Sequence, residues 1–257
     1  MPIRRKFLLI FGAISLVPLV LMGALAYRNG EEAIRTSLGG SFRLLAQEAI
    51  DKVDRGLYEV QRNASTWAGL DMMQELVTDD LDAKISTFLI AINRQYGYFA
   101  EIEALNKKGM VVASSRADAI GKDRRAETRY SRALKAESSI EDAAWDPETQ
   151  LWVVTFTFPV HAQFDENEII GALTAKWRVD ELVRMLGAEE GTDVASGSHR
   201  LLLRRDGLIL SAPRSGDDVA FKANLLARGS AAAADAARGG AGYLLEPDER
   251  GVRSLVG

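Results

Sequence analysis

Two neighbouring segments with strand-like alternation carry the residue types that could bind a small polar molecule. In residues 151–160, LWVVTFTFPV, Thr155 and Thr157 share one side with apolar residues. In residues 169–179, IIGALTAKWRV, Lys176 shares a side with apolar residues and a threonine. Apolar walls that exclude water, with a few polar groups that fix orientation, are typical of a ligand pocket. The same pattern also fits a half-exposed sheet face with solvated Thr and Lys, and both interpretations stay open at this point.

The sequence contains no pattern typical of an enzyme. It has no nucleophile paired with a base, no phosphate-binding glycine loop and no Gly-x-Ser-x-Gly elbow. There is no cysteine, and His161 and His199 lie far apart without metal-ligand spacing. Glu101 and Glu103 fall on one side of a strand, where acids are usually solvated. We therefore expect no catalysis, no cofactor and no metal in this chain.

Composition limits the class of partner. At 257 residues the chain can hold one or two domains, and 47% hydrophobic with 26% charged residues is an ordinary globular balance. The formal charge of −4 provides no basic excess, so nucleic acid is not an expected partner.

The N-terminal residues predict attachment to a membrane. Residues 7–27 form an uncharged, mostly apolar run that is long enough to cross the hydrocarbon core as a helix. Basic residues 4–6 precede it, which favours a cytoplasmic N-terminus and export of everything after residue 27. The alternative is a cleaved signal peptide, because Ala24-Leu25-Ala26 fits the pattern before a cut, and it exports the same residues.

Helical periodicity follows this run. From Leu38 to Trp67 apolar residues recur in steps of three and four, which predicts one apolar stripe on a stalk helix over residues 28–78, with bends at Gly30 or Gly39-Gly40. We expect the stripe to cover the chain's own sheet and, in addition, to pair with a second copy in a homodimer. A second helix, residues 81–96, would have Thr78 or Asp79 as its N-cap.

The next part predicts an α+β module over residues 79–187. Residues 98–115, YFAEIEALNKKGMVVASS, read as strand, Lys-Lys-Gly turn and strand, and a short helix is expected over residues 128–136. Three further strands follow, which together predict a mostly antiparallel sheet. The alternation in 151–160 places Trp152, Val154, Phe156, Phe158 and Val160 on one apolar face, suited to packing against the long helix.

A second, incomplete module is expected over residues 199–257, after a polar linker at 188–198. Residues 201–212, LLLRRDGLILSA, repeat the design of ALNKKGMVVASS, with Gly207 where Gly109 stands. The Ala-rich residues 225–238 are helix or loop, and GYLLEP and GVRSLVG predict two strands. The sheet that ends there is expected to belong to a fragment of a larger receptor, or to an abbreviated second module.

The order of these elements resembles the double Cache domain of bacterial membrane receptors, over roughly residues 27–257. The most specific pieces are the strand-Gly-strand followed by Ile120-Gly121-Lys122-Asp123, and the hairpin from Pro159-Val160 to Gly171. The resemblance implies a tandem PAS-like, extracytoplasmic sensor in the bacterial inner membrane, with the ligand held by the first module.

The resemblance also suggests site residues. The amino-acid-binding branch of that family has an Arg-x-Trp-Tyr motif and an Asp on the last strand, and the matching positions here are Glu127, Arg129, Tyr130 and Lys176. Since only the tyrosine is retained, the usual amino-acid scheme is not expected. Lys176 and Arg129 instead favour an anion such as an organic acid. Our hypothesis places Lys176, Arg129 and Tyr130 on that ligand, lined by Thr155, Thr157 and Trp145; the alternative leaves both cations solvated.

The resulting functional expectation is the sensing region of a signal-transduction receptor. Its missing output domain would most simply be a histidine kinase, with a chemotaxis signalling domain or a diguanylate cyclase as alternatives. A membrane-anchored interaction or structural protein without a small ligand is the alternative from another class.

Overall fold

The computed structural model describes residues 3–187, 201–211, 220–247 and 253–256, and it describes only the backbone at residues 3–10, 13 and 253. The chain forms two compact units: residues 49–225, the sheet unit, and residues 1–48 with 226–257, the terminal unit. The linker expected at 188–198 and the turn expected at 248–251 lie outside the described residues.

The N-terminal periodicity forms one helix, α1 (Ile3–Ala68), which contributes to both units. It contains Pro18 and continues through Gly30 and Gly39-Gly40, so the expected bends do not interrupt it. Within the described part of the chain, no helix has an apolar stretch long enough to cross a membrane. The expected span at residues 7–27 is therefore not confirmed, and its first residues lie among those whose side chains are not described.

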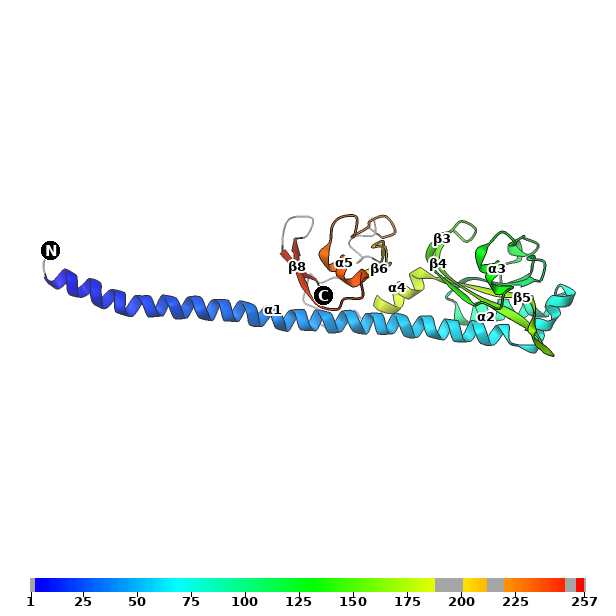
Figure 1. The fold of residues 1–257 in the computed structure, drawn as a ribbon, viewed down its shortest axis with the longest axis horizontal. Helices are drawn as coiled ribbons and strands as arrows, with labels where there is room; N and C mark the ends of the chain where they lie inside the picture. The colour runs from blue at the N-terminus through cyan, green and yellow to red at the C-terminus, as the bar shows by residue number, and fades with distance from the viewer. Residues whose placement is uncertain (1–2, 188–200, 212–219, 248–252, 257) are drawn as a thin grey trace. The chain divides into compact units, whose positions relative to one another are not determined.

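The sheet unit contains an antiparallel five-stranded sheet in the order β2-β1-β5-β4-β3. Figure 1 labels three of its strands, β3, β4 and β5. Its strands are β1 (Phe99–Asn106), β2 (Val111–Ser114), β3 (Ser139–Asp146), β4 (Leu151–Ala162) and β5 (Asp165–Arg178). The helical elements around it are η1 (Asp71–Thr78), α2 (Lys84–Tyr96), η2 (Ala117–Ala119), α3 (Thr128–Ala133) and α4 (Val179–Gly187). The expected α+β class and antiparallel sheet are confirmed.

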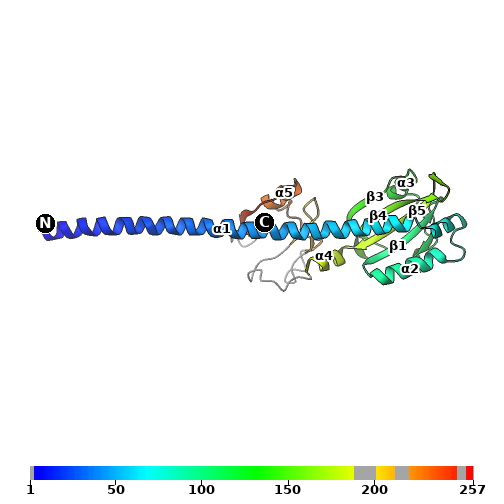
Figure 2. The same cartoon turned by 90° about the horizontal axis from the view of Figure 1, so that it is seen from below.

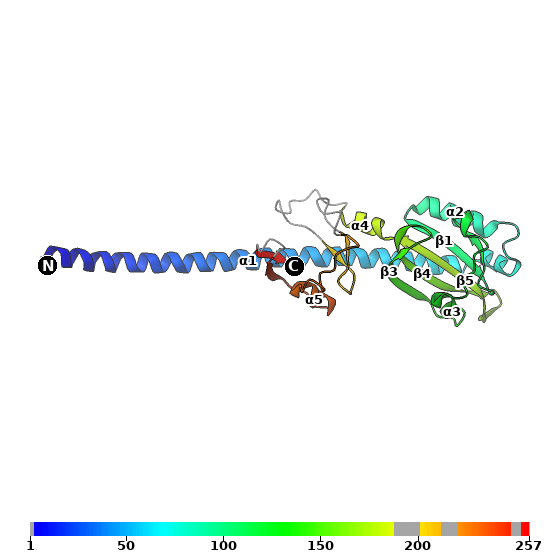
Figure 3. The same ribbon diagram turned by 90° about the horizontal axis from the view of Figure 1, so that it is seen from above.

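The two faces of the sheet are covered by different helices. Figure 2 shows the end of α1 running across one face beside α2, and Figure 3 shows α3 on the opposite face. The predicted apolar face of β4 packs against α1: the core on this side includes Val60, Ala64, Trp67, Val154, Phe156, Phe158 and Val160. Each large apolar side chain buried there contributes about 1.5–3 kcal/mol. The predicted role of the helix stripe as a cover for the sheet is confirmed.

The acids of β1 are buried, contrary to the expectation of solvated side chains. Glu101 and Glu103 are both 0% exposed, because β1 lies between β2 and β5 and its second face is covered by the segments that follow β2 and β3. Alternation along the strand gave their side correctly, but it carried no information about what covers that side.

Helix α2 begins later than expected, at Lys84 rather than Leu81. Neither Thr78 nor Asp79 caps it. The Asp80 carboxylate instead accepts hydrogen bonds from the backbone N–H groups of Ile85 and Ser86, at 2.9 and 3.0 Å. Asp79 accepts a bond of 2.7 Å from the Asn106 side-chain amide.

The second strand-Gly-strand repeats the first in hydrogen-bonded detail, as predicted. Strands β6 (Leu202–Leu203) and β7 (Ile209–Ser211) flank Gly207, whose φ of +88° matches the +79° of Gly109. The Gly109 carbonyl accepts from the N–H of Arg124 at 2.8 Å, and the Gly207 carbonyl accepts from the N–H of Leu225 at 2.9 Å.

The repeat extends to a left-handed residue after each hairpin. The N–H of Gly121 donates to Val111, and the N–H of Phe221 donates to Ile209, with φ of +86° and +60° respectively. A bulky residue is strained in this region. Phe221 is held there while its ring stacks on Trp152, with centroids 4.7 Å apart and planes 14° from parallel.

The terminal unit contains a short helix and a hairpin. Within residues 225–238 the helix is α5 (Ala231–Ala237), which begins after Ser230, whose hydroxyl accepts from the N–H of Ala233. Strands β8 (Leu244–Pro247) and β9 (Arg253–Val256) pair antiparallel, which confirms the predicted pairing of these two segments.

Replacement of Gly171 by alanine should destabilise the sheet unit. A Cβ at this β5 residue would lie 2.1 Å from the Leu105 carbonyl oxygen of β1, so the two paired strands would have to separate. We expect Gly171→Ala to lower the free energy of unfolding by about 2–3 kcal/mol or more, measured by denaturant titration. Gly69→Ala is the matched control, because its new methyl group would make only ordinary contacts. Equal stability of the two variants would contradict the close approach of β1 and β5.

Candidate functional site

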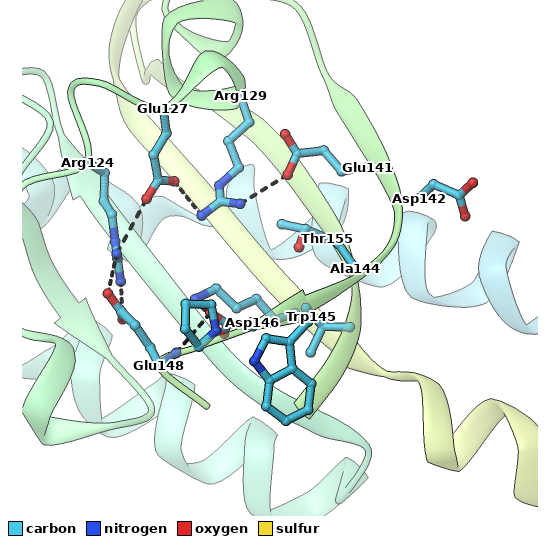
Figure 4. A pocket seen from close by; sticks show the side chains of 13 residues that line it. Arg124, Glu127, Arg129, Glu141, Asp142, Ala144, Trp145, Asp146, Glu148 and Thr155 are labelled. Carbon is cyan, nitrogen blue, oxygen red and sulfur yellow. Dashed lines mark hydrogen bonds and ion pairs between the residues drawn. The ribbon is translucent and has the colours of Figure 1, made fainter. Parts of the chain in front are cut away.

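A cavity of about 300 Å³ opens on the face of the sheet opposite α1. The strand register places Glu101, Lys176, Thr155 and Glu141 side by side in a row across β1, β5, β4 and β3. The segment before α3 and the turn after β3 complete the walls. The lining residues are Arg124, Glu127, Arg129, Glu141, Asp142, Ala144, Trp145, Asp146, Pro147, Glu148, Val153, Thr155 and Lys176 (Figure 4).

Lys176 is the buried centre of this site. Only 2% of the residue is exposed, and its Nζ donates to Glu101 Oε2 at 2.8 Å and to Asp146 Oδ2 at 3.2 Å. Burial alone would lower the pKa of Lys176, but the carboxylates of Glu103 and Glu101 outweigh it and the pKa is raised. Burial likewise opposes ionisation of Asp146, yet Lys176 keeps the pKa of that carboxyl below its ordinary value. The ammonium is therefore charged in the folded chain.

Arg124 forms the second ionic centre. Its guanidinium donates two bonds of 2.7 Å to Glu148 and one of 3.2 Å to Glu103. Lys122 also donates to Glu148, at 3.0 Å. These hydrogen bonds lower the pKa of Glu148 to about 2, and the bonds from Arg124 have the largest effect. The pKa of Glu103 shifts in the opposite direction, because burial raises it. Its Oε1 atom has no hydrogen-bond partner among the described residues.

Arg129 is paired as well. It forms an ion pair with Glu127 and donates to Glu141 at 3.0 Å, and Figure 4 shows its guanidinium between those two carboxylates. Lys176 and Arg129 thus already have carboxylate partners within the chain, and the expected contact of both cations with an anion stays a prediction. The lining holds three basic and five acidic side chains, a formal charge of −2.

The structure brings together four of the six expected site residues: Arg129, Trp145, Thr155 and Lys176 all line the cavity. Trp145 is 52% exposed, and Figure 4 shows its indole beside the segment that carries Asp146.

The other two expected residues, Tyr130 and Thr157, do not line the cavity. Tyr130 is buried in a second apolar cluster with Leu105 and Val111, and its hydroxyl donates to the Asn106 carbonyl at 3.1 Å. Thr157 is 1% exposed, and its hydroxyl lies 3.3 Å from that of Thr174.

Sequence reasoning missed the acidic half of the site. It gave no role in the site to Arg124 or to the acids Glu101, Glu103, Glu127, Glu141, Asp142, Asp146 and Glu148. A signal existed, because Glu101, Glu103, Thr155, Thr157 and Lys176 all occur at polar positions of alternating strands. The register between these strands was needed to show that they share one face.

Comparisons with known proteins add evidence on the fold. No protein-family model matches the sequence. No curated protein matches it either. Among solved structures, the sensor domain of the V. cholerae histidine kinase DctB is similar with a TM-score of 0.59 and 13% identity, over 72% of this chain and 70% of that one.

Two chemoreceptor structures are similar in the same way. The Campylobacter jejuni Tlp3 sensory domain with isoleucine bound has a TM-score of 0.58 and 15% identity, over 77% of this chain and 80% of that one. The ligand-binding domain of Pseudomonas aeruginosa PAO1 PctC in complex with GABA has a TM-score of 0.56 and 20% identity, over 86% of this chain and 90% of that one. The chain has the fold of these receptor sensor domains. The resemblance to double Cache sensors is thus confirmed at the level of the fold, and the similar structures are sensing domains rather than enzymes.

The ion pair of Glu148 should make stability sensitive to acid. Its pKa is depressed from an ordinary 4.5 to about 2 in the folded chain, so its contribution is complete above about pH 5 and is lost as the pH falls toward 2. We expect the Tm of the native chain to fall more steeply over this range than that of Glu148→Gln. Glu168→Gln, which alters an exposed pair with Lys107, should follow the native curve. Parallel curves for all three proteins would contradict this assignment.

Tyr130→Phe should separate structure from ligand binding. The substitution removes a hydrogen bond to the Asn106 carbonyl and nothing from the cavity wall. We expect a loss of about 1 kcal/mol in the free energy of unfolding, with any ligand affinity of the cavity unchanged. A large change in ligand affinity would show that Tyr130 acts in the site after all.

Proposed function

We propose that this chain is the ligand-sensing region of a bacterial transmembrane signal-transduction receptor, and that the charged cavity binds a small polar molecule. The observation that carries the proposal is this cavity, lined by Arg129, Trp145, Thr155 and the paired Lys176, within a fold shared with receptor sensor domains. The same fold binds isoleucine in Tlp3 and GABA in PctC, so it is suited to ligands of this size.

The charge of the cavity bears on the ligand class. An organic acid would have to compete with Glu127 and Glu141 for Arg129, and with Glu101 and Asp146 for Lys176. Taking one partner from a buried pair leaves an uncompensated charge, which is costly. A molecule with hydrogen-bond donors or a positive group, contacting Glu141, Asp142 and the face of Trp145, matches the surplus of carboxylates better than the anion we first expected.

The remaining parts of the proposal concern the membrane and signal transfer. The apolar run at residues 7–27 and the basic residues before it support a membrane anchor that leaves the sensor outside the cytoplasm. Val60, Ala64 and Trp67 of α1 belong to the sheet core, so a ligand that favours one arrangement of the sheet also acts on this helix. A homodimer through α1 and an output by a histidine kinase, a chemotaxis signalling domain or a diguanylate cyclase complete the proposal.

Ligand-dependent thermal stabilisation tests the proposal. A panel of amino acids, amines, organic acids and other small polar metabolites is added to the full chain, and the Tm is recorded. A true ligand at 100 times its Kd should stabilise the native state by about 2.7 kcal/mol, a shift of a few degrees. Trp145→Ala and Glu141→Gln should each lower the apparent affinity for that ligand at least tenfold, because each removes one of its expected contacts.

Phe164→Ala is the matched control, because Phe164 is 95% exposed on the turn between β4 and β5 and does not line the cavity. It should respond as the native chain does. A ligand whose effect is insensitive to both cavity variants would place binding elsewhere. No stabilisation by any compound would favour an interaction or structural protein without a small ligand.

A further inference from the structure

The Lys176 ammonium is held as a bound ligand would be held. Its two carboxylate partners come from β1 and from the end of β3, while Lys176 itself is on β5, and β4 separates β5 from β3 in the sheet. Glu101 is 0% exposed, whereas Asp146, Thr155 and Lys176 all line the cavity. The ammonium of Lys176 thus joins one carboxylate of the cavity wall, Asp146, to a fully buried carboxylate that does not line the cavity, Glu101.

We infer that Glu101 and Asp146 form a binding site for a primary ammonium group, which the side chain of Lys176 fills as a tethered occupant. The inference goes beyond the proposed function, because it assigns a ligand class to a part of the cavity that the chain itself now occupies. The Lys176 ammonium also connects β1 to the end of β3, because it bonds both Glu101 and Asp146.

The surrounding charges favour a cation at this point. Glu103 on β1 and Glu148 in the turn after β3 add negative charge nearby, and Arg124 pairs with both of them. Lys176 forms ion pairs with both Glu101 and Asp146, and Arg116 interacts with both carboxylates electrostatically. Ser114 donates a further bond to Glu101 at 3.3 Å. Without the lysine, two largely desolvated carboxylates would lose the cation bonded to both of them, which is costly and favours uptake of another positive ion.

The removed atoms define the probe. Truncation of Lys176 to alanine deletes three methylene groups and the ammonium, which together correspond to n-propylammonium. In the full chain, we expect Lys176→Ala to have a Tm well below the native value, and n-propylammonium chloride at tens of millimolar to raise it by several degrees. The native chain, whose site is filled, should shift by less than about 1 °C under the same conditions.

Three controls isolate the ammonium site. Propan-1-ol has a similar volume without the charge and should not restore stability to Lys176→Ala, and sodium chloride at equal ionic strength should not either. Lys176→Met fills the space without a charge, so it should be destabilised and insensitive to n-propylammonium. In the double variant Lys176→Ala with Glu101→Gln, one carboxylate of the site is lost. The apparent affinity for n-propylammonium, measured from the Tm shift, should therefore fall at least tenfold.

The outcomes are separable. Stabilisation of Lys176→Ala by n-propylammonium, and not by propan-1-ol, supports the site. If Lys176→Ala is unfolded, recovery of its circular dichroism with n-propylammonium supports it equally. Failure of n-propylammonium to stabilise or refold Lys176→Ala, or native stability in Lys176→Met, overturns the inference. None of these results depends on finding a ligand for the native cavity, so the proposed function stands or falls by its own test.

Discussion

Burial of one positive charge governs the organisation of the polar face of the sheet. An ammonium removed from water is tolerated only when carboxylates with good geometry replace its hydration shell. Lys176 obtains them from β1 and from the end of β3, so the register of β1, β5, β4 and β3 must align for the charge to be compensated. Glu103, also buried on β1, interacts with the same ammonium, and Arg124 adds a second cation that is hydrogen-bonded to it.

The opposite face of the sheet is stabilised by apolar packing rather than by ion pairs. There the helices α1 and α2 cover a continuous apolar surface, which stabilises the unit without regard to charge. Because apolar packing on this face stabilises the unit, single residues on the polar face can change the charge of the cavity without altering that packing. It also links the cavity to the long helix, because each strand that carries a cavity residue on one side carries core residues on the other.

The same glycine-centred hairpin occurs twice in the chain. Gly109 and Gly207 have the same left-handed backbone and accept equivalent hydrogen bonds. Phe221 occupies the position of Gly121 in the repeat, although its conformation is unfavourable for a side chain. Its ring stacks on Trp152 of β4. Arg204 donates at 2.8 Å to the carbonyl of Ala143, whose neighbours in the sequence, Asp142 and Ala144, line the cavity. The second hairpin therefore contacts the strands that carry the site.

The sequence by itself determined the features that depend on local periodicity. The apolar stripe of α1, the alternation of β4 and the Gly-centred turns predicted the elements and the face that packs on the helix, because these patterns are set by the geometry of helix and strand. From strand alternation and the family resemblance together it proposed six site residues, of which Arg129, Trp145, Thr155 and Lys176 line the cavity.

Only the tertiary structure decided the charges of the site. Which carboxylates reach Lys176 depends on contacts between residues as far apart as Glu101 and Lys176, and strand alternation gives a side but no partner. Burial of Glu101 and Glu103, pairing of Arg129 and the departure of Tyr130 into the second apolar cluster all follow from strand register and from the loops that close over the sheet. The expected ligand changed for the same reason: a lysine in a sequence is a free cation until the fold supplies its partners.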